Sequence, residues 1–169
     1  MENNIENTCF FTGHRTIPKS DMTHLTSVLD GKIHELISEG CVNFICGGAV
    51  GFDTLAACRV IVAQKHFPEV KLTLLLPCRD QTARWKNGYD IALYQRIKGY
   101  AEKIIYASDT YTSGCMHQRN RMMADMSRYC VAYYNNSGSG GTAYTVRYAR
   151  ETGKTVINLH DILKMNDEA

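Results

Sequence analysis

The chain lacks the long apolar runs of a membrane protein and the large positive charge of a typical nucleic-acid-binding protein. Its longest apolar runs, such as residues 72–77, fall far short of the ~20 residues that a membrane helix needs. The formal net charge is only +2 at pH 7, so any basic surface has to be local. No signal peptide is recognisable. We therefore expect no membrane contact and a cytoplasmic location.

Metal and redox motifs are also lacking. The seven cysteines include no Cys-x-x-Cys pair, and the six histidines form no His-Glu-x-x-His pattern. An odd number of cysteines within mostly apolar runs is typical of reduced core thiols in a cytosolic protein. We expect no metal site.

The length and composition are those of one globular domain. The 169 residues are 44% hydrophobic and 21% charged, and no repeat, linker or low-complexity segment interrupts them. We expect a single domain over residues 1–169, with fraying at residues 1–7 and 166–169.

Strand-like and helix-like segments alternate along the chain. Most of the expected strands are continuously apolar, which is typical of strands buried on both faces of a parallel sheet. They span residues 8–12, 42–46, 70–76, 103–107, 129–134 and 155–159. Helices are expected over residues 25–37, 52–66, part of 84–100, 117–128 and 143–152. This order predicts an α/β fold, a Rossmann-like three-layer α/β/α sandwich with a mostly parallel sheet of about six strands.

A glycine-rich segment joins the fifth expected strand to the following helix. Glycines at such a junction expose consecutive N–H groups, and the helix adds its positive end, which together make an anion cradle. We expect phosphate contacts from Ser137, Gly138, Ser139, Gly140, Gly141 and Thr142.

A second glycine-rich loop follows the second expected strand, with Gly47, Gly48, Ala49 and Gly51 as further expected phosphate contacts. Its glycines have an alternative role in permitting a tight turn and close packing. Asp53 is interpreted as a contact for ribose hydroxyls and as a weak candidate for catalysis, or else as a favourable acid in a first helical turn.

Cations near a helix start point to an anion at the same sheet edge. Arg119 and Arg121 oppose the helix dipole there, and guanidinium groups suit bidentate phosphate recognition. The alternative is that both are solvated surface residues.

The first strand is followed by Thr12, Gly13, His14 and Arg15, which belong to the same expected ligand edge. His14 is a turn residue or a polar contact, and Trp85, Tyr89 and Tyr94 are core residues or a stacking wall for a base.

Three separated motifs identify a family resemblance. The Phe11-to-Arg15 loop resembles the opening Gly-x-Arg loop of the SLOG superfamily of nucleotide-binding proteins, close to its YpsA-like branch. Residues 47–56 resemble a Gly-x-Ala-x-Gly-x-Asp segment of the DNA-processing protein A family. Residues 119–127 and 137–143 are similar to its Arg-Asn-Arg-x-x-Ala-x-x-Ser motif and its Ser-Gly-Ser loop. The resemblance implies a ligand contact for Asn120 and a homodimer.

The chain also resembles the "lonely guy" phosphoribohydrolases, in Met116-His117-Gln118-Arg119 and in Gly140-Gly141-Thr142. Those enzymes continue Gly-Thr-x-x-Glu, and Thr145 stands at the position of that catalytic glutamate. Threonine cannot supply a carboxylate, so the resemblance leaves enzymatic activity undecided.

The first function predicted is the binding or sensing of a phosphorylated, nucleotide-like small molecule, with a nucleotide or an ADP-ribose-like compound as the ligand. The first alternative is a hydrolase that acts on an N-glycosidic or phosphoester bond of a nucleotide derivative. The second alternative is an accessory protein that binds single-stranded DNA weakly, with a short track of Arg15, Arg79, Arg84, Arg119 and Arg121.

Overall fold

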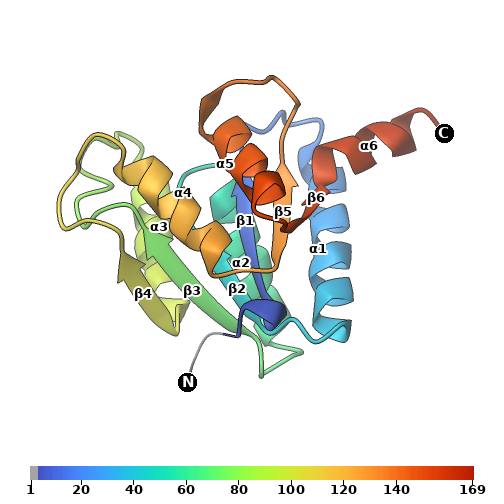
Figure 1. Cartoon of the computed structure of the whole chain (residues 1–169), viewed down its shortest axis with the longest axis horizontal. Coiled ribbons are helices and arrows are strands. Elements are labelled where there is room, and N and C mark those ends of the chain that lie inside the picture. Colours follow the sequence, from blue (N-terminus) through green and yellow to red (C-terminus); the bar gives the residue numbers. More distant parts are fainter. Residues whose placement is uncertain (1–3) are drawn as a thin grey trace.

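The computed structural model describes residues 4–169 and confirms the predicted α/β fold. Its six strands are β1 (Thr8–Gly13), β2 (Asn43–Cys46), β3 (Lys71–Leu76), β4 (Lys103–Tyr106), β5 (Tyr129–Tyr133) and β6 (Thr155–Asn158). They form one parallel sheet in the order β4-β3-β2-β1-β5-β6 (Figure 1). The order reverses beside β1, because the chain passes from β4 at one edge of the sheet to β5, which pairs with β1. Ligands of open α/β sheets bind at such a switch point.

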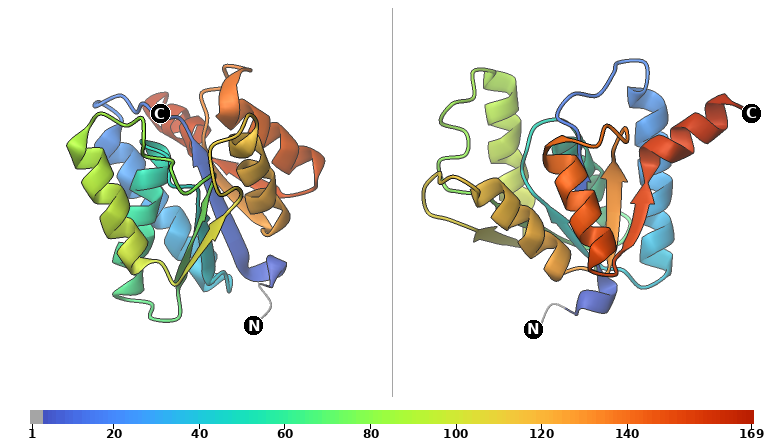
Figure 2. Two further views of the ribbon diagram at one scale, coloured as in Figure 1. Left: turned by 90° about the vertical axis from the view of Figure 1, so that its left-hand side faces the viewer. Right: turned by 45° about the horizontal axis from the view of Figure 1, so that its top comes forward.

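Helices cover both faces of the sheet, as the two views of Figure 2 show. They are α1 (Met22–Ser38), α2 (Phe52–Gln64), α3 (Gly88–Tyr100), α4 (Cys115–Asp125), α5 (Gly140–Glu151) and α6 (Leu159–Asp167). The larger core cluster lies under α1, α2, α3 and α6, and the smaller one lies under α4 and α5. Phe11 and Phe44 of adjacent strands stack in the larger cluster, with ring centroids 6.0 Å apart.

Helix α6 lies outside the helices that the sequence pattern indicates. Asn158 caps its start by accepting a hydrogen bond from the His160 backbone N–H, and Leu159 and Leu163 are buried. The helix spans only nine residues, so its apolar periodicity is too short to stand out. At the other end of the chain, Ile5–Asn7 form one 3₁₀ turn, and residues 1–3 of the segment expected to fray lie outside the described residues.

No helix within residues 4–169 is both long and apolar enough to cross a membrane. The seven cysteines are free thiols, and all except Cys58 are buried. In the described part of the chain, no group of three or more His, Cys, Asp or Glu side chains is placed to hold a metal ion.

Candidate functional site

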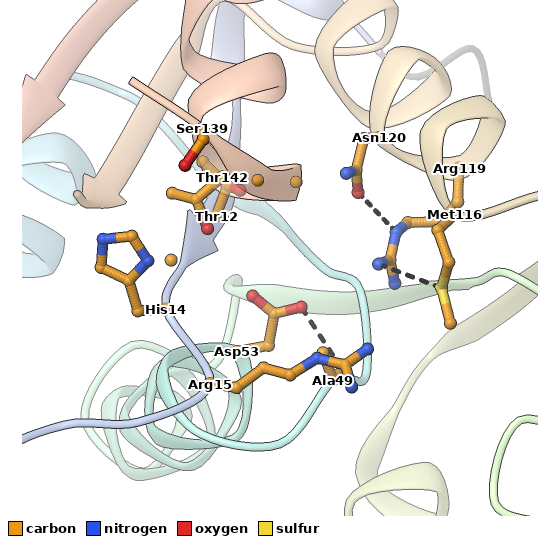
Figure 3. A pocket seen from close by; sticks show the side chains of 13 residues that line it. Thr12, His14, Arg15, Ala49, Asp53, Met116, Arg119, Asn120, Ser139 and Thr142 are labelled. Atoms are coloured by element: carbon orange, nitrogen blue, oxygen red, sulfur yellow. Dashed lines mark hydrogen bonds between the residues drawn. The ribbon is translucent and has the colours of Figure 1, made fainter. Parts of the chain in front are cut away.

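A cavity of about 380 Å³ opens at the carboxyl edge of the sheet, beside the switch point. The end of β1 and the loop after it, the β2–α2 loop with the start of α2, the first two turns of α4 and the start of α5 line it (Figure 3). They are Thr12, Gly13, His14, Arg15, Ala49, Asp53, Met116, Arg119, Asn120, Ser139, Gly140, Gly141 and Thr142. All of them except Met116 are residues that the sequence pattern places at a ligand site. Met116 begins the Met-His-x-Arg motif, and that motif was the available signal for it.

The N-terminus of α5 forms one wall of the cavity. Ser139 is its N-cap residue but makes no side-chain capping bond, and Gly140 has a φ of 91°. The first N–H groups of a helix have no partner within the helix. Gly140, Gly141 and Thr142 line the cavity, so the positive end of the helix dipole adjoins it. Anions are favoured at a helix start of this kind.

The glycines of the β2–α2 loop serve close packing. A Cβ atom on Gly47 would lie 2.5 Å from Arg119 Nη1, and one on Gly51 would collide with the backbone of Arg15. Gly51 also has a φ of 83°, and Gly48, with a φ of 73°, packs against Leu76. These three glycines do not line the cavity, whereas Ala49 of the same loop does. The loop thus brings Asp53 and Arg119 close together.

Asp53 lies in the first turn of α2 and is only 5% exposed. Its Oδ2 accepts a hydrogen bond of 3.3 Å from the Ala49 backbone N–H, and its carboxyl group faces the cavity in Figure 3. Burial raises the pKa of Asp53 to about 6, although the nearby Arg119 guanidinium acts to lower it. The cavity therefore holds a carboxyl group that titrates close to neutral pH.

Arg119 is buried, with 5% of its surface exposed, and is held by neutral partners. Its Nη1 donates to the Gly47 carbonyl, its Nε donates to Asn120 Oδ1 at 2.7 Å, and its Nη2 lies 3.9 Å from Met116 Sδ. Burial lowers the pKa of Arg119. Among the described residues, no carboxylate lies within 4.0 Å of this guanidinium. A buried cation without a contacting counter-charge favours an anion in the adjoining space.

His14 fixes the loop in front of α5. Its Nε2 accepts a hydrogen bond of 2.9 Å from the Asn135 backbone N–H, and its ring packs against Tyr134 at 5.8 Å between centroids. The structure therefore gives His14 a turn-stabilising contact as well as a place in the cavity wall. Arg15 lies at the exposed mouth of the cavity.

Besides the three glycines of the β2–α2 loop, three further predicted site residues lie away from the cavity. Arg121 donates from Nη1 to the Tyr144 hydroxyl at 2.8 Å on the α4–α5 surface, so it does not join Arg119. Ser137 and Gly138 lie in the loop before α5 and do not line the cavity. Among the aromatic candidates, Trp85 packs edge-on against the buried Tyr94, whereas Tyr89 is 74% exposed.

Thr145 occupies the interior of α5, where the phosphoribohydrolase motif carries its glutamate. Its side chain is fully buried and donates to the Gly141 carbonyl at 2.8 Å. Thr145 does not line the cavity. The catalytic carboxylate of that motif therefore has no counterpart at this position.

This fold, with a cavity at its switch point, defines a Rossmann-like α/β protein. The family model YpsA, described as the YspA SLOG family, matches residues 11–167. The chain belongs to this family. The match spans both glycine-rich loops and the Arg119 helix.

Curated relatives are similar over most of their length. The chain is 30% identical over 154 residues to the uncharacterised SPbeta prophage-derived protein YoqJ of Bacillus subtilis, covering 82% of this chain and 89% of YoqJ. It is 25% identical over 146 residues to a UPF0398 protein of Staphylococcus epidermidis, covering 81% of this chain and 77% of the relative.

Two solved structures of DNA processing protein A share the fold. The Helicobacter pylori protein, whose structure is described for its mode of binding single-stranded DNA, has a TM-score of 0.60 and 17% identity. The Streptococcus pneumoniae protein has the same TM-score and identity. Each comparison covers 88% of this chain, but the chain spans only 63% and 48% of those two proteins. At this identity the likeness shows the fold alone.

Proposed function

We propose that this protein binds a phosphorylated, nucleotide-like small molecule in the cavity at the switch point. The observation that carries the proposal is the uncapped start of α5, which faces the same space as the buried Arg119. The helix start supplies N–H donors and Arg119 supplies a positive charge, so a phosphate group there would offset an otherwise costly arrangement.

Asp53 supports a sugar as the second part of the ligand. Hydroxyl groups are suitable donors for a carboxylate, whereas another phosphate so near Asp53 would be repelled. The cavity volume of about 380 Å³ lies within the usual range for small-molecule sites. We therefore propose that phosphate lies against α5 and sugar hydroxyls lie against Asp53, with a nucleotide or an ADP-ribose-like compound as the ligand.

Binding assays with the purified protein test the phosphate part. Isothermal titration with adenosine monophosphate, ADP-ribose and ribose 5-phosphate should detect at least one ligand. Gly141→Val should abolish that binding, because Gly141 lines the cavity and a Cβ there meets no protein atom within 4 Å. Arg15→Gln should weaken binding about tenfold. Arg121→Gln is the matched control and should leave the affinity unchanged, because Arg121 lies outside the cavity.

The sugar part is tested with Asp53→Asn, which keeps the size of the side chain. Affinity for ribose-bearing ligands should fall about tenfold, whereas affinity for inorganic phosphate should stay equal or rise. A folded Gly141→Val variant that binds every compound as tightly as the native protein would contradict the phosphate site. Equal affinity of the native protein and Asp53→Asn for ribose 5-phosphate would contradict the contact with sugar hydroxyls.

Hydrolysis of a nucleotide derivative is a second candidate, and Asp53 is the observation that favours it. Among the described residues that line the cavity, Asp53 has the only carboxyl group, and burial brings its pKa to about 6. A carboxyl group with a pKa near neutrality suits general acid or base catalysis. Chromatography of each ligand after incubation with the protein tests this candidate, and product that forms with native protein but not with Asp53→Asn would support it.

Weak binding of single-stranded DNA is a third candidate, favoured only by the shared fold with the Helicobacter pylori protein. Three arginines of the expected DNA track are buried or bonded to other side chains. Arg119 is buried, Arg79 pairs with Asp109 at 3.2 Å, and Arg121 is bonded to Tyr144. We therefore rank this function below small-ligand binding. A homodimer stays a prediction, which sedimentation equilibrium of the purified chain tests.

A further inference from the structure

The loop of residues 135–139, here called the cradle loop, carries the chain from β5 to the start of α5. All five residues are exposed, and the apolar core does not hold them. Asn136 adopts a left-handed conformation with a φ of 60°, the only positive φ among the described residues other than glycine. Asparagine adopts this conformation more readily than most residues that carry a side chain.

Three hydrogen bonds join the cradle loop to fixed parts of the molecule. The Asn135 N–H donates to His14 Nε2 at 2.9 Å, and the Gly138 N–H donates to the Tyr134 hydroxyl at 2.8 Å. The third bond joins the loop to α6, where Asp161 Oδ1 accepts from Asn136 Nδ2 at 2.9 Å. The left-handed backbone and this long-range bond therefore meet in one residue.

Helix α6 is a firm anchor for that third bond. Asn158, its N-cap residue, donates to the Tyr134 carbonyl at 2.9 Å and accepts from the Tyr134 N–H at 3.1 Å. Leu159 and Leu163 are buried against the core. Asp161 lies in the first turn of this anchored helix, and its position relative to the end of β5 is therefore set.

We infer that Asn136 and Asp161 form a latch through which α6 holds the cradle loop, and with it the first turn of α5, in the geometry that receives an anion. Both are positioning residues, since neither lines the cavity. The effect on binding rests on the proposed function. The effect on the loop does not, because the bond exists without any ligand.

Asn136→Gly is the cleanest variant, because it removes the amide of the side chain while glycine adopts the left-handed φ freely and the charge stays unchanged. Asp161→Ala breaks the same bond and also removes a negative charge near the anion site. Simple electrostatics then predicts tighter anion binding, whereas the latch predicts weaker binding. The exchanged pair Asn136→Asp with Asp161→Asn keeps the net charge and allows the bond to form with donor and acceptor reversed.

Amide hydrogen exchange in the absence of ligand, measured by NMR, tests whether the latch holds the cradle loop. The Ser137 amide donates to Asn135 Oδ1, and the Gly138 amide donates to the Tyr134 hydroxyl. Both amides should exchange about three to ten times faster in Asn136→Gly and in Asp161→Ala. The exchanged pair should return to the native rate. Phe10, in the central strand β1, is the control amide and should not change. Titration with inorganic phosphate should show weaker binding in both single variants and restored binding in the exchanged pair.

Unchanged exchange at Ser137 and Gly138 in both single variants would overturn the latch. So would an exchanged pair whose rates are as fast as those of Asn136→Gly, because the effect would then not come from this bond. If the native protein binds neither phosphate nor any ligand of the binding assays, the proposed function fails, and the exchange rates still decide whether the latch exists.

Discussion

Arg119 of α4 and Asp53 of α2 approach the same point above Gly47. The position that a Gly47 Cβ would occupy lies 2.5 Å from Arg119 Nη1 and 2.9 Å from Asp53 Oδ2. Yet the two side chains make no ion pair within 4.0 Å, and each is held by backbone of the β2–α2 loop. A buried carboxyl group and a buried guanidinium group beside a cavity, both with shifted pKa values, mark a candidate functional site.

The first prediction concerns Asp53 and the pH dependence of stability. Its folded-state pKa of about 6 is above the ordinary value of 3.8, so the folded state binds more protons between these values. The contribution of Asp53 to the free energy of unfolding should therefore fall by about 3 kcal/mol as pH rises from about 4 to about 6. Asp53→Asn should remove this dependence and be more stable than the native protein at pH 7.5.

Urea denaturation of both proteins at pH 4, 5, 6 and 7.5 measures this difference. Near pH 4 the two stabilities should converge, because the native carboxyl group is then protonated in the folded state. An Asp53→Asn variant that is less stable than the native protein at pH 7.5 would show that the carboxylate stabilises the fold. The pKa of Asp53 would then be lower than we state.

The second prediction separates glycines required by packing from those that are not. Gly51→Ala should lower the free energy of unfolding by about 2–5 kcal/mol, because Gly51 has a φ of 83° and its Cβ would collide with the Arg15 backbone. Gly31→Ala is the matched control within α1, where a Cβ meets nothing within 4 Å. It should raise stability by about 0.5–1 kcal/mol, since alanine favours helices. Urea denaturation of both variants checks these opposite signs.

The third prediction concerns Thr145. The native protein should release no free base from adenosine monophosphate, because the motif glutamate is absent. Thr145→Glu should not create that activity, since Thr145 is fully buried outside the cavity. A carboxylate there should cost about 3 kcal/mol or more of stability. Thermal unfolding measures the loss, with Thr145→Ser as the control that keeps the hydroxyl bond to Gly141.

Chromatographic detection of base released by the native protein would contradict the third prediction. A stable and active Thr145→Glu variant would show that the helix turns this position toward the ligand. Neither result would bear on the proposed phosphate contact with the N-terminus of α5, because Gly141→Val tests that contact separately.

The fourth prediction separates a small-ligand site from a DNA track. Binding of single-stranded DNA should be weak and nearly independent of length beyond a few nucleotides, since few free cations surround the cavity. The slope of log affinity against log salt should then be shallow, at roughly −0.7 for each phosphate contacted. Fluorescence anisotropy with oligonucleotides of increasing length measures both quantities. Affinity that grows with length and resists competition by a mononucleotide would reverse our ranking.

Local patterns in the sequence determined the architecture and the edge at which the site lies. Continuous apolar strands alternating with helices sufficed for the parallel sheet, because each signal comes from neighbouring residues. The glycine-rich junction before α5 could also be predicted from the sequence, because a helix N-terminus without a capping side chain is a local property. Helix α6 was not predicted, because nine residues are too few to show a clear helical periodicity of apolar residues.

Only the tertiary structure decided which residues of each motif face the cavity. Arg119 and Arg121 are two residues apart and look alike in sequence, but two residues turn a helix by about 200°. Arg119 consequently points into the molecule against Gly47, and Arg121 points to Tyr144 on the surface. The glycines after β2 are likewise explained by contacts with Arg15, Leu76 and Arg119, which lie far away in the chain. Burial and long-range contact are properties of the packed chain, and no short pattern of residues contains them.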